Sequence, residues 1–144
     1  MSTPERFQYG EYTGMSDTEN KNSTDPWHAD GRTVLCGANA YDRKYYFNPD
    51  FNAIPDSIKR ELNVISVLFT QEAGGIFTIV FEKDGSISFV TDAEEDDITY
   101  DEVSAGLLVG EIRRNRTELL ESIELFYRVM FLHEDDARLL DTDD

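Results

Sequence analysis

The sequence is poor in the residues that most often hold metals or form disulfide bonds, with one cysteine, Cys36, and two histidines among 144 residues. A single cysteine cannot form an internal disulfide bond or a cysteine zinc cluster. The sequence also lacks an apolar run of about 18 residues, which a transmembrane helix requires. It lacks, too, the basic start and apolar segment of a secretory signal. We therefore expect a cytoplasmic protein with no membrane partner.

Positive charge is scarce as well, because 13 lysines and arginines stand against 30 aspartates and glutamates and leave a formal net charge of −17. Binding to nucleic acid requires a basic surface that displaces counterions from the phosphates. An anionic membrane surface likewise attracts basic segments. The charge balance therefore argues against nucleic acid as a partner.

Recognisable catalytic motifs are absent from the sequence. It contains no phosphate-binding glycine loop, dinucleotide fingerprint, histidine metal motif or Gly-x-Ser-x-Gly elbow. We therefore expect no cofactor, and the balance favours a protein that is not an enzyme.

The composition predicts one domain between two tails. Residues 1–31 are rich in polar residues and glycine and show no apolar periodicity, which is typical of a disordered tail. Residues 134–144 form a second tail, in which like charges favour extension. The remaining residues, 32–133, have a length suited to a single core.

The first half of this domain shows strand and helix patterns. Thr33 to Cys36 and Arg43 to Phe47 read as two short strands around a turn-prone segment. A helix is expected from Pro55 to Ala73, and Gly74 and Gly75 favour its end. Its predicted apolar face contains these residues: Ile58, Leu62, Ile65 and Phe69, widened by Val64 and Leu68.

The segment "IFTIVFEKDGSISFVTD" predicts a β-hairpin. A two-residue turn at Asp84-Gly85 would place apolar residues opposite polar ones. A three-residue loop from Lys83 to Gly85, closed by a left-handed glycine, instead pairs apolar residues across the strands. This register gives the following pairs: Phe81 with Ile87, Ile79 with Phe89, and Phe77 with Thr91.

A long helical region is expected from Tyr100 or Asp101 to about Leu132, with a break near Gly110. The predicted order is thus strand, strand, helix, strand, strand, long helix. This order predicts a two-layer α+β domain in which helices cover an antiparallel sheet of about four strands.

Three groups of residues are candidates for function. Cys36, beside a glycine, is a possible nucleophile, but it lacks a base, because the two histidines are His28 in the predicted tail and His133 at the far end of the last helix. The acidic run 92–97 offers carboxylates for a metal ion, with Asp92, Glu94 and Asp96 as candidates, although it lacks the glycine and the final glutamate of a calcium loop. A solvated loop at the start of a helix explains this run equally well.

The third group is rich in tyrosine and was interpreted as an interaction surface. It consists of Tyr41, Arg43, Lys44, Tyr45 and Tyr46. Alternation along a strand places Tyr45 with Phe47 on one face and Tyr46 on the other. Exposed tyrosines supply rigid amphipathic contact area at protein interfaces.

Four segments together carry a resemblance to a known family: "VLCGANAYDRKYYFNPDF", "IPDSIKREL", "GGIFTIVFEKDGSISF" and "LLESIELFYRVMF". Over about Thr33 to His133 the chain resembles a family of small, acidic, uncharacterised bacterial proteins classified as a domain of unknown function. The resemblance implies a bacterial cytosolic domain and brings with it no activity, cofactor or catalytic residue.

Three functional hypotheses follow from these observations. The first is a non-enzymatic protein-binding or adaptor module, whose partner is another protein or a second copy of the chain. The second is a small enzyme or a metal- or ligand-binding protein that uses Cys36 or the acidic loop 92–97. The third is an acidic mimic of nucleic acid, which requires regular rows of acids on one surface.

Overall fold

A computed structural model of the chain describes residues 27–29 and 31–132, so most of the predicted tails, 1–31 and 134–144, lie outside the described residues. The strands are β1 His28–Ala29, β2 Arg32–Asn39, β3 Lys44–Phe47, β4 Ile76–Phe81 and β5 Ile87–Asp92. The helices are the 3-10 helix η1 Pro49–Phe51 and the α-helices α3 Asp56–Ala73, α4 Glu102–Asn115 and α5 Thr117–Met130. None of the helices in this described part is long and apolar enough to cross a membrane.

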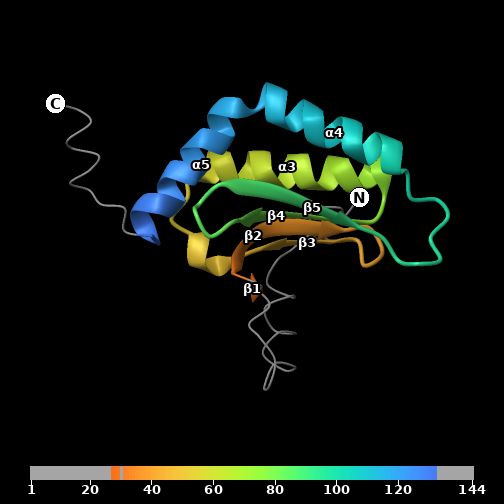
Figure 1. The fold of residues 1–144 in the computed structure, drawn as a ribbon, viewed down its shortest axis with the longest axis horizontal. Coiled ribbons are helices and arrows are strands. Elements are labelled where there is room, and N and C mark those ends of the chain that lie inside the picture. Colours follow the sequence, from red (N-terminus) through yellow and green to blue (C-terminus); the bar gives the residue numbers. More distant parts are fainter. Residues whose placement is uncertain (1–26, 30, 133–144) are drawn as a thin grey trace, which may run out of the picture.

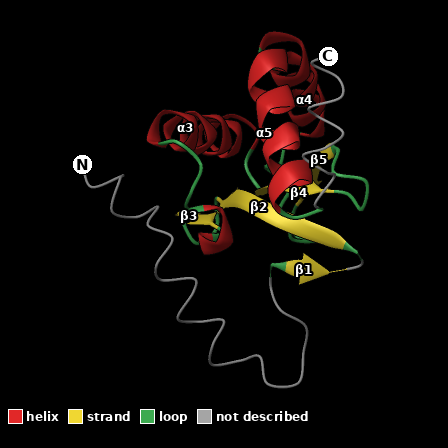
Figure 2. Ribbon diagram, turned by 90° about the vertical axis from the view of Figure 1, so that its left-hand side faces the viewer, coloured by secondary structure: helices red, strands yellow, loops and turns green. Residues whose placement is uncertain are grey.

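The strands form one antiparallel sheet in the order β1-β2-β4-β5, and β3 also pairs with β2. β1 pairs with the start of β2 and β3 pairs with its end, so that both lie along the same side of β2. All three α-helices lie on one face of this sheet, with α3 on the β3 side and α4 and α5 on the β5 side (Figures 1 and 2). The predicted α+β class with a sheet covered by helices is confirmed. β1 was not expected as a strand, because two residues carry no periodicity.

The hairpin has the predicted register. Phe81 pairs with Ile87, Ile79 with Phe89 and Phe77 with Thr91. The amide of Glu82 donates to the carbonyl of Ser86 at 2.8 Å and closes a loop in which Gly85 has a φ of 90°. The left-handed glycine therefore fulfils the role that the three-residue loop required.

The helix α3 ends as predicted, but its buried face differs from the prediction. Val64 and Leu68 are 46% and 52% exposed and do not widen the apolar face. The face extends instead to Ser66 and Thr70, which are buried because each hydroxyl has a partner in the core. Hydrophobicity alone therefore predicts the wrong boundary for the buried face of α3.

The predicted long helix is two helices, and its break lies at Arg116 and not near Gly110. Arg116 leaves the helical region with φ −121° and ψ 31°, while Gly110 lies inside α4. The change of direction brings the apolar face of α5, which includes Ile123 and Tyr127, onto the sheet. Burial of that face against the strands outweighs the weak helix propensity of a glycine.

Aromatic rings fill the core beneath α5. The rings of Phe81 and Tyr127 stack with centroids 4.1 Å apart, and Phe51 of η1 lies 5.4 Å from Phe81. The Tyr127 hydroxyl also shares a buried hydrogen bond with the Thr33 hydroxyl at 3.0 Å. This cluster holds α5 against β2 and β4.

Candidate functional site: an acidic cleft beside a strand edge

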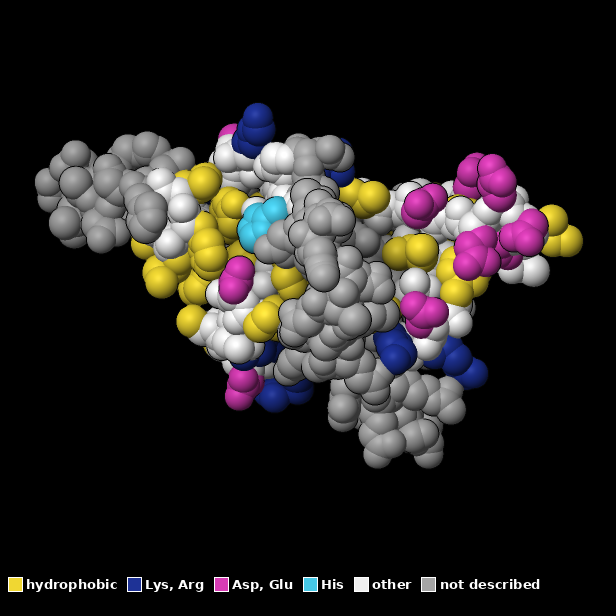
Figure 3. Space-filling view, turned by 90° about the horizontal axis from the view of Figure 1, so that it is seen from below, with side chains coloured by type: hydrophobic (Ala, Val, Ile, Leu, Met, Phe, Trp, Pro, Cys, Tyr) yellow, Lys and Arg dark blue, Asp and Glu magenta, His cyan; other side chains and the backbone are white. Residues whose placement is uncertain are grey.

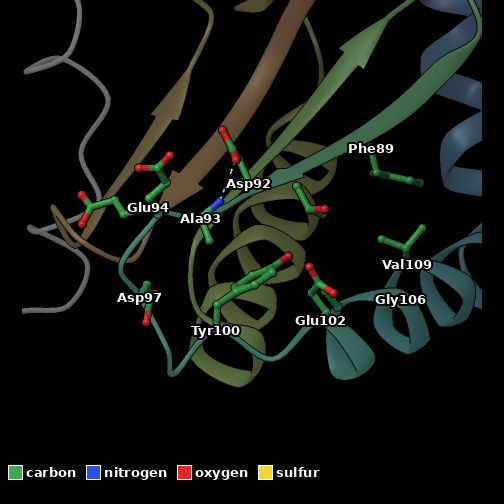
Figure 4. Close-up of a pocket in the computed structure, with 12 residues that line it drawn as sticks. Phe89, Asp92, Ala93, Glu94, Asp97, Tyr100, Glu102, Gly106 and Val109 are labelled. Atoms are coloured by element: carbon green, nitrogen blue, oxygen red, sulfur yellow. Dashed lines mark hydrogen bonds between the residues drawn. The ribbon is translucent and has the colours of Figure 1, made fainter.

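A cleft of about 780 Å³ lies between the edge strand β5, the loop 93–101 and the helix α4 (Figure 4). We call it the β5–α4 cleft, and it is lined by Phe89, Thr91, Asp92, Ala93, Glu94, Glu95, Asp97, Tyr100, Glu102, Ala105, Gly106 and Val109. Its volume falls within the range of about 300 to 1,000 Å³ that is typical of ligand-binding sites.

The cleft exists because α4 packs along α3 and stays away from the end of β5. The amide of Asp101 donates to the carbonyl of Ala73 at 3.1 Å, which ties the start of α4 to the end of α3. The Asp101 carboxylate then caps α4 by accepting from the amide of Ser104 at 3.0 Å. Further along α4, Gly106 has no side chain, and a Cβ added there would meet nothing within 4 Å. The helix is thus held away from β5, and its glycine leaves the space open.

The wall of the cleft made by the loop is held in place by Tyr41, which comes from the turn between β2 and β3. The Tyr41 hydroxyl donates to Asp97 at 2.5 Å and accepts from the amide of Glu94 at 3.1 Å. The second oxygen of Asp97 accepts from the amide and the hydroxyl of Thr99. The acidic loop is therefore an ordered wall built from its own hydrogen bonds.

These contacts change the acidity of both partners. Hydrogen bonds from the Thr99 hydroxyl and then from Tyr41 lower the pKa of Asp97 below its usual value. The hydrogen bond to Asp97 raises the pKa of Tyr41. Asp97 is therefore ionised and Tyr41 is protonated at neutral pH, as their hydrogen bond requires.

Negative charge dominates the lining of the cleft. Of the described residues that line it, five are acidic and none is basic; the acids are Asp92, Glu94, Glu95, Asp97 and Glu102. Seen from the far side of the sheet, described Asp and Glu side chains gather at the end of the molecule where the loop 93–101 lies (Figure 3). The cleft can therefore attract a cationic group and repel an anionic one.

Beyond the cleft, two helical side chains cover the beginning of the β5 edge. Glu124 of α5 accepts the amide of Ile87 at 2.8 Å, and Arg113 of α4 donates to the carbonyl of Ile87 at 3.1 Å. The Arg113 guanidinium also lies over the ring of Phe89, 4.7 Å from its centroid. Together the two side chains give Ile87 the donor and the acceptor that a neighbouring strand would provide.

The structure does not gather the predicted metal ligands into a metal site. Across residues 27–29 and 31–132, no group of three or more histidine, cysteine or acidic side chains is arranged to hold an ion. The carboxylate of Asp92 turns back to accept the amide of Ala93 at 2.8 Å, as the dashed line in Figure 4 shows. The acidic run instead forms the wall of the cleft.

Cys36 is a residue of the core. Its side chain is fully buried between β2 and α3, and its Sγ lies 3.9 Å from the Ser66 hydroxyl. Burial raises the pKa of the Cys36 thiol to about 12, although hydrogen bonds from Tyr45 and Ser66 oppose the rise. A buried, protonated thiol lacks the thiolate character that a nucleophile needs.

The residues of the predicted tyrosine-rich surface do not lie together: one is in the core, one contacts the loop of the cleft, and the others lie in or next to the turn between β2 and β3. Tyr45 is only 2% exposed and does not belong to a surface, because its strand turns it toward α3 with Phe47. Tyr46 points to the opposite face and donates its hydroxyl to Asp42 at 3.2 Å. Arg43 occupies the turn with a φ of 58°, next to the half-buried Lys44. Tyr41 alone reaches the cleft.

Several residues of the cleft carried little signal in the sequence. Gly106 lies within the predicted long helix without any distinguishing signal, and Phe89 is predicted only as a residue of the hairpin. Arg113, together with Arg114 and Arg116, reads in the sequence as a basic cluster. In the structure Arg113 turns to β5, while Arg116 lies 3.6 Å from Glu61 of α3. Their partners are distant in the chain, so spacing could not reveal these roles.

Comparison with known proteins supports the resemblance noted in the sequence. The model of a family of unknown function, DUF6145, matches residues 32–135. Neither the search of the curated proteins nor that of the solved structures found a match. Because the matched segment contains most of the chain and every strand and helix from β2 to α5, the chain belongs to this family of unknown function, DUF6145.

Proposed function

We propose that this chain is a non-enzymatic protein-binding module and that the β5–α4 cleft is its binding site. The observation that carries the proposal is the position of the cleft, which opens directly beside the edge strand of the sheet. A hollow bordered by a strand edge and a helix offers a partner backbone hydrogen bonds as well as side-chain contacts. We place this activity in the cytoplasm, in keeping with the sequence.

Exposed apolar side chains that neighbour lining residues in the sequence, although they do not line the cleft themselves, support a protein partner. Ile98 of the loop is 95% exposed, and Val103 and Leu107 of α4 are 74% and 68% exposed. Large apolar side chains gathered beside a polar hollow are typical of protein interaction sites. Their burial would add contact area around the charged cleft.

The chemistry of the described residues favours binding over catalysis. The thiol of Cys36 is buried and protonated, and the carboxylate of Asp97 is fully engaged with Tyr41 and Thr99. A catalytic residue must present its reactive atom to a substrate. The cleft instead presents carboxylates and apolar side chains, which are features of a recognition site.

The experiment that tests this proposal fills the cleft without disturbing the core. Gly106→Leu places a side chain in the open space, and the exchange of a helical glycine favours folding by up to about 1 kcal/mol. The matched control is Gly110→Leu, one turn further along the same helix and not part of the lining. There a Cβ lies 3.3 Å from the end of the flexible Arg114 side chain, which can move aside.

Full-length wild type and both variants are immobilised, and the proteins that each captures from an extract of the producing cells are compared by quantitative mass spectrometry. We expect a stoichiometric partner that Gly106→Leu loses by at least about tenfold and Gly110→Leu retains. Equal capture by both variants, or capture by none of the three proteins, would overturn the proposal.

A further inference from the structure

The proposed binding site is bordered by backbone groups of β5 whose direction follows from the hydrogen-bond pattern. In an antiparallel pair, residue pairs that share hydrogen bonds alternate with pairs that do not. The amide of Glu82 donates to the carbonyl of Ser86 at 2.8 Å, so this pair belongs to the first kind. By alternation, the pairs Val80 with Ser88 and Thr78 with Val90 also share hydrogen bonds.

The other residues of β5 direct their amide and carbonyl groups away from β4. These residues are Ile87, Phe89 and Thr91. The far side of β4 gives an independent check, because the amide of Ala40 donates to the carbonyl of Gly75 at 2.9 Å and places the backbone of Phe77 toward β2. The pairing on both sides of β4 therefore indicates that the backbone groups of Ile87, Phe89 and Thr91 point away from β4.

Within the described part of the chain, only the first of the three outward positions has hydrogen-bond partners. Glu124 and Arg113 bind both backbone groups of Ile87. Among residues 27–29 and 31–132, no hydrogen bond from another element reaches the outward groups of Phe89 or Thr91, and both residues line the cleft. The edge is therefore covered at one end and open for about four residues at the other, a length of roughly 13 Å at about 3.3 Å per residue.

The groove along this open edge favours one kind of occupant. Unpaired amide and carbonyl groups at a sheet edge bind an extended backbone. The five carboxylates of the lining, with no basic residue among them, require that the extended segment be cationic. A second copy of this chain would bring its own acidic cleft to the same place, and repulsion between the two sets of carboxylates disfavours that arrangement.

We propose that the open part of the β5 edge takes up an extended segment rich in lysine or arginine as an additional strand of the sheet. The segment exchanges backbone hydrogen bonds with Phe89 and Thr91, while its basic side chains lie among the carboxylates of the loop 93–101 and of Glu102. The inference rests on the proposed function and specifies the class and conformation of the partner.

The test uses a synthetic ten-residue peptide of alternating lysine and valine, added to the full-length protein. We expect saturable binding that weakens as salt is raised, since the attraction between exposed charges is screened. In hydrogen exchange followed by NMR, the amides of Phe89 and Thr91 should slow on binding, whereas that of Val90, already bonded to β4, should change little. A peptide in which glutamate replaces lysine should not bind.

Backbone methylation of the peptide separates strand addition from simple charge attraction. One set of alternate peptide amides faces β5, and methylation of that set removes donors without changing the charge. We expect one methylated peptide to lose affinity by at least about tenfold and the complementary peptide to keep it. On the protein side, Thr91→Pro removes one outward donor and should weaken binding more than Thr91→Val, which changes the side chain but retains the amide.

Equal affinity for both methylated peptides, or slower exchange at Val90 in place of its neighbours, would overturn strand addition. Failure of the lysine-valine peptide to bind would overturn the cationic preference, and so would dimerisation through this edge at low salt. These results would leave the proposed function intact if Gly106→Leu still releases a captured protein. Loss of that effect would remove the proposed function itself.

Discussion

At Ile87 the edge of β5 meets two long side chains from the helices, whereas two residues further on, at Phe89, the same edge borders an open cleft. The difference arises from the helices and not from the strand. Arg113 lies close to the junction of α4 and α5, and Glu124 lies in the middle of α5, which packs on the sheet. At the other end, α4 is tied to α3 through Asp101 and stays away from β5.

The comparison shows that side chains can protect the backbone groups of single residues along a sheet edge while their neighbours stay accessible. Natural proteins protect edge strands with charged side chains, bulges or covering elements, because unpaired edges otherwise recruit other chains. Here a carboxylate and a guanidinium protect one residue. The adjoining residues are bordered by carboxylates that do not bind the edge, so that it is open to a segment of the right charge and closed to others.

The strongest test of this comparison exchanges neighbouring residues of β5 for proline. Val90→Pro removes an amide that bonds to β4 and should lower the free energy of unfolding by about 3 kcal/mol. Thr91→Pro removes an amide that points outward, where proline is tolerated in edge strands, and should lower it by less than about 1 kcal/mol. Urea unfolding of the two variants measures the difference. Equal losses would mean that the outward direction of Thr91 is wrong.

The second test removes the cover from Ile87. Glu124→Ala leaves a partly buried amide without its acceptor and should lower the free energy of unfolding by about 1 to 3 kcal/mol. Glu124→Gln keeps an oxygen in the same position and should lose no more than about half as much. Both are measured by chemical denaturation against wild type. If alanine and glutamine have the same effect, the hydrogen bond to Ile87 does not carry the stabilisation.

The hairpin of β4 and β5 was predictable from the sequence, but which residues along the β5 edge are covered was not. The register of β4 and β5 follows from alternation and one turn glycine, and the end of α3 follows from Gly74, because both signals are local. The side chains that hydrogen-bond to the backbone of Ile87 come from residues 26 and 37 positions away in the sequence. No local pattern can identify such partners.

The candidate site illustrates the same limit. The acidic run was visible in the sequence, but its shape depends on Tyr41, 56 residues from Asp97. The sequence predicts an interaction surface for Tyr41 and either a metal site or a solvated loop for the acids, and only the fold brings the two together. Likewise, the break at Arg116 depends on how α5 packs on the strands. A prediction based on the weak helix propensity of Gly110 therefore places the break at the wrong residue.

The smallest expected effect concerns the wall of the cleft, which belongs to the open end of β5. Tyr41→Phe removes the hydroxyl that holds Asp97 and Glu94, so the pKa of Asp97 should rise toward its usual value of about 3.9. It should remain below that value, because the hydrogen bond from Thr99 is the larger cause of the lowering. Titration of the Asp97 carboxyl carbon by NMR measures the change.

The pH dependence of stability has a defined sign. A carboxylate whose pKa is lowered by folding stabilises the fold above its unfolded pKa, and that contribution is lost as the pH falls through the folded pKa. Wild type should therefore exceed Tyr41→Phe in stability at neutral pH, and the difference should shrink in acid. Tyr46→Phe is the matched control, because the Tyr46 hydroxyl donates to Asp42. If the two variants titrate alike at Asp97, Tyr41 does not hold this wall, and the cleft owes its form to Thr99 and the cap of α4.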